Sequence, residues 1–396
     1  MRSGLRCVVA LHRFLLQLVH PTQIGEALVP GATLLRVSTE LGLRLTFEVA
    51  GRNIHVEVFP KEPHQRHAAA SEQLLFAYRS HGLAGAKFES VGKQLCEAVA
   101  QRARVHEASA LKSMEERAQQ AREEAGQTRI REVRVEQLLE HVGHGDVSRN
   151  GGYYTLSPYV GCLVGCKFCY AGERTGMLRA LQGLQPAPWG SYVDVRTNAA
   201  EVLRKELGEL PPLPIKFCPI VSDPYQAAET RYRVTRGCLE VLADVAPERA
   251  LLLLSRTTRL REDIELMTRL PALRVGASIP TVDDAAREHF EPRGAPIEAR
   301  FAQLEELRAR GITTFAVVQP MLPGNVEELA DRLLAACDSV SIDVLDGVYG
   351  AAEEFSDPRY AFAAEQEWQV AQARALAAAL GERGVPLWRG DLPPDL

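Results

Sequence analysis

The order of apolar and polar residues changes along the chain, and its first part alternates. Apolar and polar residues alternate over Leu43–Val49 and again over residues 54–59, with the turn-forming segment Ala50-Gly-Arg-Asn53 between them. This pattern predicts a β-hairpin. Helical periodicity near residues 69–78 and 91–102 adds two helices. Residues 1–105 are therefore expected to form a small α+β domain.

From Tyr154 onward, apolar runs of strand length alternate with helical stretches. The strand-like runs lie at residues 155–160, 215–221, 250–255, 274–280, 313–320 and 339–345. The helical stretches lie at 198–207, 234–246, 261–270, 297–310 and 326–336. Continuous apolar strands separated by helices predict a parallel sheet that the helices cover. Six such units predict an α/β fold, a partial (β/α)6 TIM-type barrel over residues 151–350, with functional groups at the C-terminal ends of its strands.

Two further segments complete the predicted organisation. Residues 106–150 are charged, with Glu and Arg at helical spacings, and are expected to form a linker helix. Within them, the alternating run at 128–135 predicts a strand or an extended connector. Residues 351–396 contain an Ala-rich helix around 363–380, which is expected to close one end of the barrel. The N-terminal domain either recognises a substrate such as a peptide or only covers apolar surface.

Composition narrows the classes of protein. With 396 residues, 46% of them hydrophobic, the chain can form one large and one smaller domain. A net charge of −5 argues against general nucleic-acid binding, although a local basic groove is compatible with it. The eight cysteines lack paired spacing outside one motif, so a reducing cytoplasm is expected rather than secretion. The apolar run at 7–16 contains His12 and Arg13, which favours a buried element over a signal peptide or membrane span.

That motif is the stretch Ser157-Pro-Tyr-Val-Gly-Cys-Leu-Val-Gly-Cys-Lys-Phe-Cys-Tyr170, with the spacing C-x3-C-x2-C. Three thiolates on a short loop can hold an iron–sulfur cluster. A 4Fe–4S cluster usually takes four cysteines, so three would leave one iron open for a small molecule. Gly161 and Gly165 permit tight turns, and Phe168 and Tyr170 are expected to be apolar cover. Two alternatives remain open: free thiols in the core, or a zinc site with a distant fourth ligand, although no second C-x2-C pair exists.

The cysteine motif resembles that of the radical S-adenosylmethionine (SAM) superfamily, where an aromatic residue such as Phe168 precedes the last cysteine. The resemblance implies that Cys162, Cys166 and Cys169 hold a 4Fe–4S cluster whose open iron binds SAM. It further implies that reductive cleavage of SAM gives a 5′-deoxyadenosyl radical, which takes a hydrogen atom from a substrate. A flavodoxin- or ferredoxin-type protein is the expected reductant.

Polar residues at the predicted strand ends are the candidates for SAM contacts. Ser222 and Asp223 are suited to the ammonium group, Arg256 to the carboxylate, and Ser278 to the carboxylate or the ribose. Further polar residues at strand ends are Gln319, Asp343 and Asp346. Each residue has an alternative role as a helix or loop cap, because Ser, Thr and Asp are favoured there.

Four segments resemble the spore photoproduct lyase-like branch of this superfamily: residues 166–171, 221–226, 275–281 and 290–296. The resemblance covers residues 156–346 and implies SAM contacts from Tyr170 and Ala171, Ser222 and Asp223, Arg256, and Ser278. Arg256 stands where the lyase usually has Lys, which keeps the charge but changes its geometry.

A second departure concerns catalysis. Ile220 stands where the lyase has a hydrogen-donating cysteine, whereas Cys218 lies two residues earlier, on the same face of a strand. Cys218 and Tyr225 are the candidates for catalytic side chains.

Three functions follow as hypotheses. The first is a radical SAM enzyme that acts on a peptide or protein by carbon–carbon chemistry, epimerisation or backbone excision. The second is a lyase for a thymine photoproduct in DNA, with Arg231, Arg233 and Arg236 as positive charges. The third is an iron–sulfur scaffold or electron carrier, for which a second cysteine cluster is missing. The N-terminal domain, the acidic charge and Ile220 favour the first. No membrane partner is expected.

Overall fold

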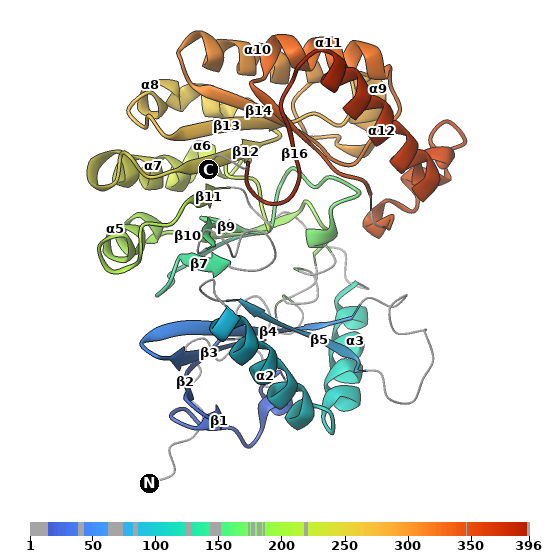
Figure 1. The fold of residues 1–396 in the computed structure, drawn as a ribbon. Helices are drawn as coiled ribbons and strands as arrows, with labels where there is room; N and C mark the ends of the chain where they lie inside the picture. Colours follow the sequence, from blue (N-terminus) through green and yellow to red (C-terminus); the bar gives the residue numbers. More distant parts are fainter. Residues whose placement is uncertain are drawn as a thin grey trace. The chain divides into compact units, whose positions relative to one another are not determined.

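The structure is a computed structural model that describes residues 15–38, 43–61, 74–81, 86–122, 129–142, 152–172, 175, 179, 184, 187–217, 221–345 and 347–393. The chain forms two compact units (Figure 1). The first comprises Met1–Gly126, His141–Tyr153 and Arg174–Ala187; the second comprises Gln127–Glu140, Tyr154–Glu173 and Pro188–Leu396. Most of the apolar run at 7–16 lies outside the described residues.

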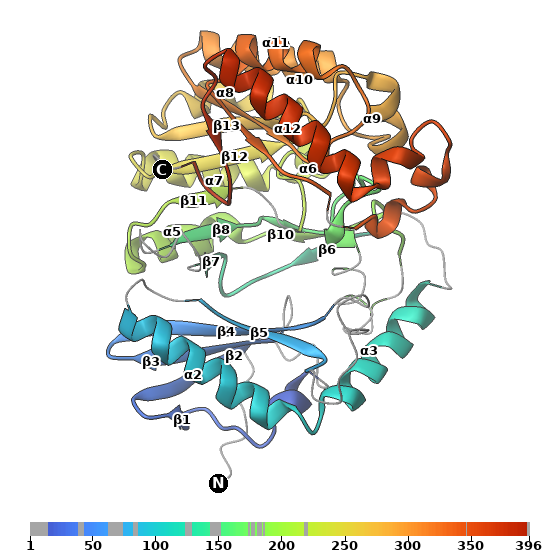
Figure 2. The ribbon, with the colours of Figure 1, turned by 45° about the vertical axis from the view of Figure 1, so that its right-hand side comes forward.

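The first unit is built on a five-stranded antiparallel sheet whose strands keep their order along the chain. The strands are β1 (Ala27–Val29), β2 (Ala32–Ser38), β3 (Leu43–Val49), β4 (Arg52–Pro60) and β5 (Phe76–His81). The helices are η1 (Leu16–Val19), α2 (Ala86–Ala103) and α3 (Glu107–Arg122), and Figure 2 shows α2 running along the sheet. Buried apolar side chains from the strands and from α2 and α3 form one core.

The sequence predicted the hairpin of this unit correctly, but one of its two helices was wrong. β3 and β4 pair from Leu43↔Val58 to Val49↔Arg52, as the alternating pattern predicted. Residues 76–78, predicted to be helical, lie in β5, where Tyr78 pairs with Val58. A short apolar run does not distinguish helix from strand by periodicity alone, and here the open edge of β4 decides for a strand. Residues 69–73 lie outside the described residues.

The second unit contains an eight-stranded sheet in the order β16-β15-β14-β13-β12-β11-β8-β7. Neighbouring strands from β8 to β16 run parallel. The strands are β7 (Leu139–Val142), β8 (Tyr153–Leu156), β11 (Ile215–Phe217), β12 (Leu251–Ser255), β13 (Leu273–Ser278), β14 (Thr313–Val318), β15 (Ser339–Ile342) and β16 (Leu387–Trp388). Six of them overlap the six predicted runs, so the chain has the mixed α/β fold that the pattern indicated.

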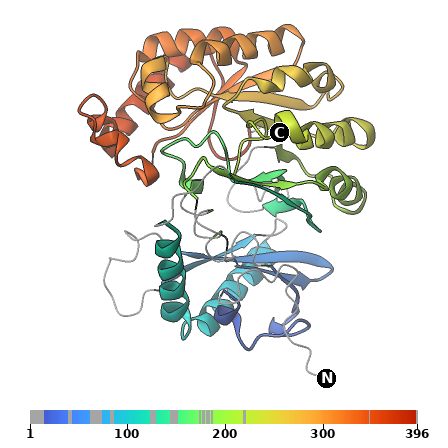
Figure 3. The same cartoon turned by 180° about the vertical axis from the view of Figure 1, so that it is seen from behind.

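Helices connect the parallel strands, as predicted, and cover the outer face of the sheet (Figures 1 and 3). They are α5 (Ala199–Glu209), α6 (Glu229–Tyr232), α7 (Val234–Val245), η3 (Arg259–Asp263), α8 (Ile264–Met267), α9 (Asp284–Phe290), α10 (Ile297–Ala309) and α11 (Val326–Ala336). After β15 come η4 (Tyr349–Ala351), η5 (Glu354–Ser356), η6 (Ala361–Ala364) and the predicted Ala-rich helix, α12 (Gln366–Glu382). The main core of this unit joins the sheet to these helices.

A small second sheet was not foreseen in full. Its order is β6 (Arg129–Val133), β10 (Tyr192–Arg196) and β9 (Tyr159–Val160). The run at 128–135 is therefore a strand, and it pairs in parallel with β10. The first predicted strand divides into β8 and β9, with Ser157 and Pro158 between them, because proline has no N–H group to give to a ladder.

Three side chains from alternate strands meet on the other face of the large sheet. Leu252 of β12, Phe315 of β14 and Trp388 of β16 form a separate buried cluster, and the rings of Phe315 and Trp388 lie 6.0 Å apart. Layers from alternate strands are typical of barrel interiors. Among the described helices, none combines the length and the apolar character that crossing a membrane requires.

Candidate active site

The three motif cysteines lie on a loop that leaves β9 and ends in a helical turn at Tyr170. Cys162 and Cys166 are buried, and Cys169 is partly buried. Gly161 has a φ of +89°, and a Cβ atom there would lie 2.7 Å from the ring and the carbonyl oxygen of Tyr192. The close approach of Tyr192 therefore requires glycine at this position.

Gln226 fixes the start of this loop from the segment that follows β11. Its side chain is fully buried. It accepts a hydrogen bond from Leu163 N (2.8 Å) and donates one to Gly161 O (3.1 Å). The backbone N–H of Gly161 donates to Val221 O (3.0 Å). The segment expected to contact SAM thus also holds the cysteine loop, a role of Gln226 that the sequence analysis missed.

An apolar cluster covers the other side of the loop. Phe168 packs with Phe290, Phe355 and Tyr360, and Lys167 N donates to Phe290 O (2.9 Å). The expected covering role of Phe168 is confirmed. That of Tyr170 is not, because 42% of Tyr170 is exposed; it stands on the helical turn after the last cysteine and lines a cavity.

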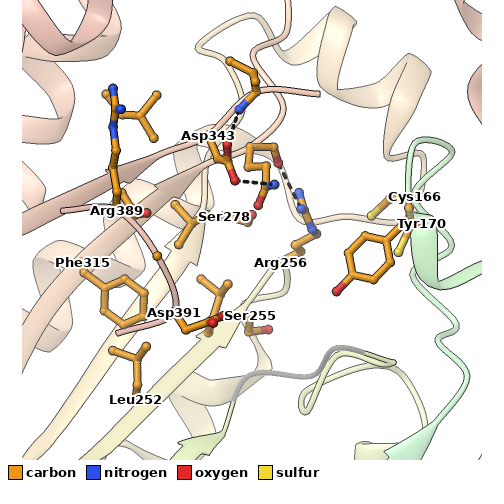
Figure 4. A pocket seen from close by; sticks show the side chains of 18 of the residues that line it. Cys166, Tyr170, Leu252, Ser255, Arg256, Ser278, Phe315, Asp343, Arg389 and Asp391 are labelled. Carbon is orange, nitrogen blue, oxygen red and sulfur yellow. Dashed lines mark hydrogen bonds between the residues drawn. The ribbon is translucent and has the colours of Figure 1, made fainter. Parts of the chain in front are cut away.

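That cavity, of about 780 Å³, brings the predicted residues together (Figure 4). Eleven of the fourteen candidate residues line it: Cys162, Cys166, Cys169, Tyr170, Ala171, Ser222, Asp223, Arg256, Ser278, Gln319 and Asp343. They come from the cysteine loop and from the C-terminal ends of neighbouring parallel strands, where an α/β sheet presents its functional groups.

Asp223 is buried and accepts three hydrogen bonds. Its donors are Arg256 N (2.7 Å), Ser255 Oγ (2.8 Å) and Tyr225 N (2.9 Å). Burial raises the pKa of Asp223, although these hydrogen bonds oppose the shift. A carboxylate offers about four acceptor positions, so one remains for a further donor.

Arg256 belongs to a buried network of charges. Its guanidinium pairs with Glu291, donates to Gln319 O (3.3 Å) and stacks over the ring of Phe168 at 5.3 Å. Glu291 also pairs with Arg300 at 2.5 Å, and both of their side chains have no exposed surface. Arg300 donates to Ser278 O (2.6 Å).

Glu291 therefore links the two strands that carry Arg256 and Ser278. Burial alone would raise the pKa of Glu291, but Arg300 and Arg256 outweigh it and lower the pKa. Glu291 lies in the segment 290–296, one of the four that resemble the lyase-like branch, but no role was expected for it. A guanidinium in the interior needs a partner of opposite charge, and this need of Arg256 is the signal that could have pointed to Glu291.

The chemistry of these residues fits a cluster and a polar ligand. The hydroxyl oxygens of Ser222 and Ser278 are buried in the cavity wall and have no hydrogen-bond partner among the described residues. A bound ligand would supply one. Burial raises the pKa of all three cysteine thiols, to about 12 for Cys162.

In the described part of the chain, no three His, Cys, Asp or Glu side chains lie close enough to hold a single metal ion. A cluster of four irons is larger, and each of its thiolates binds a different iron.

Three candidates stand apart from this set. Tyr225 does not line the cavity; it is 1% exposed, and its hydroxyl donates to Asp263 (3.0 Å). Cys218 and Asp346 lie outside the described residues. Asp343 does line the cavity and accepts from Gln319 Nε2 (3.3 Å) and from Val344 N (2.9 Å).

The side of the cavity away from the cysteines contains residues that the sequence analysis did not select. Figure 4 shows Leu252, Phe315 and Arg389 on this side. One face of α12 and the tail after it also line the cavity, with Val370, Ala373, Arg374 and Ala377 on α12 and Leu387, Trp388, Arg389, Gly390 and Asp391 in the tail. Asp391 pairs with Lys216 of β11 at 2.9 Å.

Residues 156–337 match the family description Radical SAM superfamily. They include the cysteine loop and the strand ends that carry Ser222, Asp223, Arg256, Ser278 and Gln319. This part of the chain is therefore similar to radical SAM domains, a class of domain that uses a 4Fe–4S cluster and SAM.

Curated relatives match over less than half of the chain. Uncharacterized protein MJ0683 of Methanocaldococcus jannaschii is 24% identical over 45% of this chain and 63% of its own length. Uncharacterized protein Rv2578c of Mycobacterium tuberculosis is 31% identical over 46% of this chain and 54% of its own. The Radical SAM Nalpha-GlyT isomerase of Pseudomonas phage M6 is 26% identical over 45% of this chain and 36% of its own. The match thus spans less than two thirds of each relative.

Among solved structures, spore photoproduct lyase complexed with dinucleoside spore photoproduct is similar, with a TM-score of 0.47 and 13% identity. The similarity covers 66% of this chain and 81% of that one.

Proposed function

We propose that this protein is a radical SAM enzyme with its active site in the cavity beside the cysteine loop. The observation that carries the proposal is the shared lining: three cysteines and seven polar or backbone contacts chosen from the sequence surround one cavity. When bound, the cluster and SAM supply a 5′-deoxyadenosyl radical that takes a hydrogen atom from the substrate, with the electron coming from a flavodoxin- or ferredoxin-type protein.

The roles of the chain's own residues follow from their positions. Cys162, Cys166 and Cys169 hold the cluster. The remaining acceptor position of Asp223 and the free hydroxyl of Ser222 receive the ammonium group of SAM. Arg256, which Glu291 holds at the cavity wall, binds the carboxylate.

The remaining contacts surround the rest of SAM. Ser278 offers an unpartnered hydroxyl to the carboxylate or the ribose. Gln319, Tyr170 and the backbone of Ala171 border the same space. Tyr225 positions Asp223 through its backbone N–H rather than touching the ligand.

The large sheet is, in this proposal, a partial (β/α)6 barrel, and the first unit recognises the substrate. We assign the substrate to the class of peptides and proteins. The alternative of a thymine lesion in DNA needs a basic groove. Two of the arginines considered for it are paired instead: Arg233 with Glu262 (2.7 Å) and Arg236 with Asp263 (2.5 Å) and Glu240 (2.8 Å).

The test is the cleavage of SAM. The protein is reconstituted anaerobically with iron and sulfide, given SAM and dithionite, and assayed for 5′-deoxyadenosine by mass spectrometry. The expected result is formation of 5′-deoxyadenosine that depends on the three cysteines. A protein that holds the cluster and never cleaves SAM would be a scaffold or an electron carrier. Gel-shift binding to irradiated duplex DNA separates the two substrate classes.

A further inference from the structure

The half of the cavity away from the cysteines has no role in the proposed SAM site. Part of its wall is apolar: Leu252, Leu254, Phe315, Val317 and Trp388 line it from the strands and the tail. Figure 4 places Arg256 and Ser278 between the cysteines and the side with Phe315 and Arg389. A ligand that fills the cysteine side would leave this half for the substrate, because a radical formed in the cavity must meet its target there.

The polar groups in this half without a protein partner are hydrogen-bond donors. The indole Nε1 of Trp388 is buried and has no partner among the described residues. Arg374 and Arg389 also line the cavity and form no hydrogen bond or ion pair within the described part of the chain. Arg374 and Arg389 are exposed. An indole N–H and a guanidinium can only donate, so a ligand that binds to these groups supplies acceptors.

Other side chains in this half could accept hydrogen bonds from the arginines, but each of them already has a donor or is neutral. Asp391 pairs with Lys216. Asp343 accepts from Gln319 and from Val344 N. Ser341 offers a neutral hydroxyl that can donate or accept. No carboxylate among the described residues forms an ion pair with Arg374 or Arg389.

The helix that carries Arg374 leaves room for a ligand beside it. Val370, Ala373, Arg374 and Ala377 are spaced so that they share one face of α12, and all four line the cavity. Two alanines on this face leave space next to the guanidinium. The ring of Trp388 packs against that of Phe315.

We propose that this half of the cavity binds the substrate through an apolar group and an adjacent carboxylate, as a peptide presents at an apolar C-terminal residue or beside an Asp or Glu. Leu254 and Val317, which are partly exposed, receive the apolar group, with Leu252 and Phe315 packed beside them. Arg374, Arg389 and the indole N–H of Trp388 receive the carboxylate. This assignment rests on the proposed function and specifies the substrate of the same site.

A peptide fits better than a nucleic acid. Nucleic-acid sites follow the backbone with a series of cations and stack bases on exposed aromatic faces. Here two arginines are unpaired within the described chain, and Phe315 and Trp388 are buried and packed edge to face. The net charge of −5 points the same way.

The test uses small probes with the reconstituted holoprotein and saturating SAM, without reductant. Isothermal titration calorimetry compares 4-phenylbutyrate, 4-phenylbutylamine and the dinucleotide thymidylyl-thymidine. The carboxylate is expected to bind at least tenfold more tightly than the amine. The double substitution Arg374→Gln and Arg389→Gln should weaken it at least tenfold. Trp388→Phe, which keeps the apolar wall, should weaken it about threefold.

Matched measurements separate the possible failures. Arg383→Gln, at the end of the same helix and outside the cavity, should leave probe binding unchanged. The affinity for SAM should stay within twofold in every variant. Equal binding of amine and carboxylate, or tighter arginine-dependent binding of the dinucleotide, overturns the inference while the SAM site stands. If the unsubstituted holoprotein does not bind SAM, the proposed function itself is wrong.

Discussion

At the cysteine side of the cavity, buried hydrogen bonds and ion pairs hold the functional groups, whereas at the tail side donors project from apolar walls. Asp223 accepts three hydrogen bonds, and Glu291 and Arg300 form a pair with no exposed surface. On the tail side, Arg374 and Arg389 have no partner in the described chain.

This difference suggests a division of tasks. A ligand that is the same in every turnover is bound best by preorganised groups, since their ordering is already complete. A substrate side chain is received by an apolar wall with donors that become satisfied on binding. Substitutions should therefore lower stability more on the cysteine side than on the tail side.

The largest effect is expected from replacing Cys162, Cys166 and Cys169 with Ala. Formation of 5′-deoxyadenosine should fall to background, and bound iron should be lost, because these three cysteines are the proposed ligands of the cluster. Iron and sulfide analysis with mass spectrometry measures both. Cys96→Ala, in the first unit, is the matched control and should keep both; retention of activity in the triple variant would contradict the assignment.

Next in size is Glu291→Gln. It leaves Arg300 as an uncompensated buried charge, so the free energy of unfolding should fall by about 3–5 kcal/mol. Urea unfolding measures this loss. Glu327→Gln, which affects an exposed pair with Arg383, should change stability little.

The same variant has a pH signature. The pKa of Glu291 is lowered from its ordinary 4.5, so its stabilisation is complete above pH 4.5 and is lost as the pH falls through the lowered value. Below pH 4.5 the wild-type protein should therefore lose stability more steeply than Glu291→Gln. Parallel pH profiles of the two proteins would argue against an ionised Glu291.

Glu291 should also act on SAM only through Arg256. Arg256→Met and Glu291→Gln should each weaken SAM binding, about tenfold for Arg256→Met, and the double variant should bind no more weakly than Arg256→Met. Calorimetric titration of SAM into the four proteins completes the cycle. Additive losses would assign Glu291 a separate, purely structural role.

A smaller loss is expected from Gln226→Leu. It leaves Leu163 N and Gly161 O without their partner, and an unpaired buried polar group costs about 1–3 kcal/mol. We expect a loss of about 2 kcal/mol in urea unfolding, together with weaker retention of iron. Gln94→Leu, at an exposed position of α2, is the control. Unchanged iron retention would show that the cysteine loop does not need this clamp.

The smallest effect belongs to the tail side. Asp391→Asn removes the charge that Lys216 faces in a partly exposed pair, so stability should fall by about 1 kcal/mol or less. SAM cleavage should stay within twofold of the wild type. If the free energy of unfolding fell as much as in Glu291→Gln, the proposed difference between the two sides of the cavity would be wrong.

Local sequence determined much of the second unit. The cysteine spacing places three thiols on one short loop, and the strand periodicity placed six parallel strands. The strand ends then predicted Ser222, Asp223, Arg256, Ser278 and Gln319, since parallel strands end on one edge of a sheet. All five line the cavity. These inferences depend on neighbours within a few residues, which the sequence displays directly.

Tertiary structure alone decided the supports and the other half of the cavity. Glu291 lies 35 residues from Arg256, Gln226 lies 65 from Gly161, and Asp391 lies 175 from Lys216. It also turned residues 76–78 into a strand, because β4 offered an open edge. Such pairings depend on which buried groups meet after the chain has folded, and no periodicity records them. The sequence thus identified the groups of the cysteine side, and folding supplied their partners and the donors of the tail side.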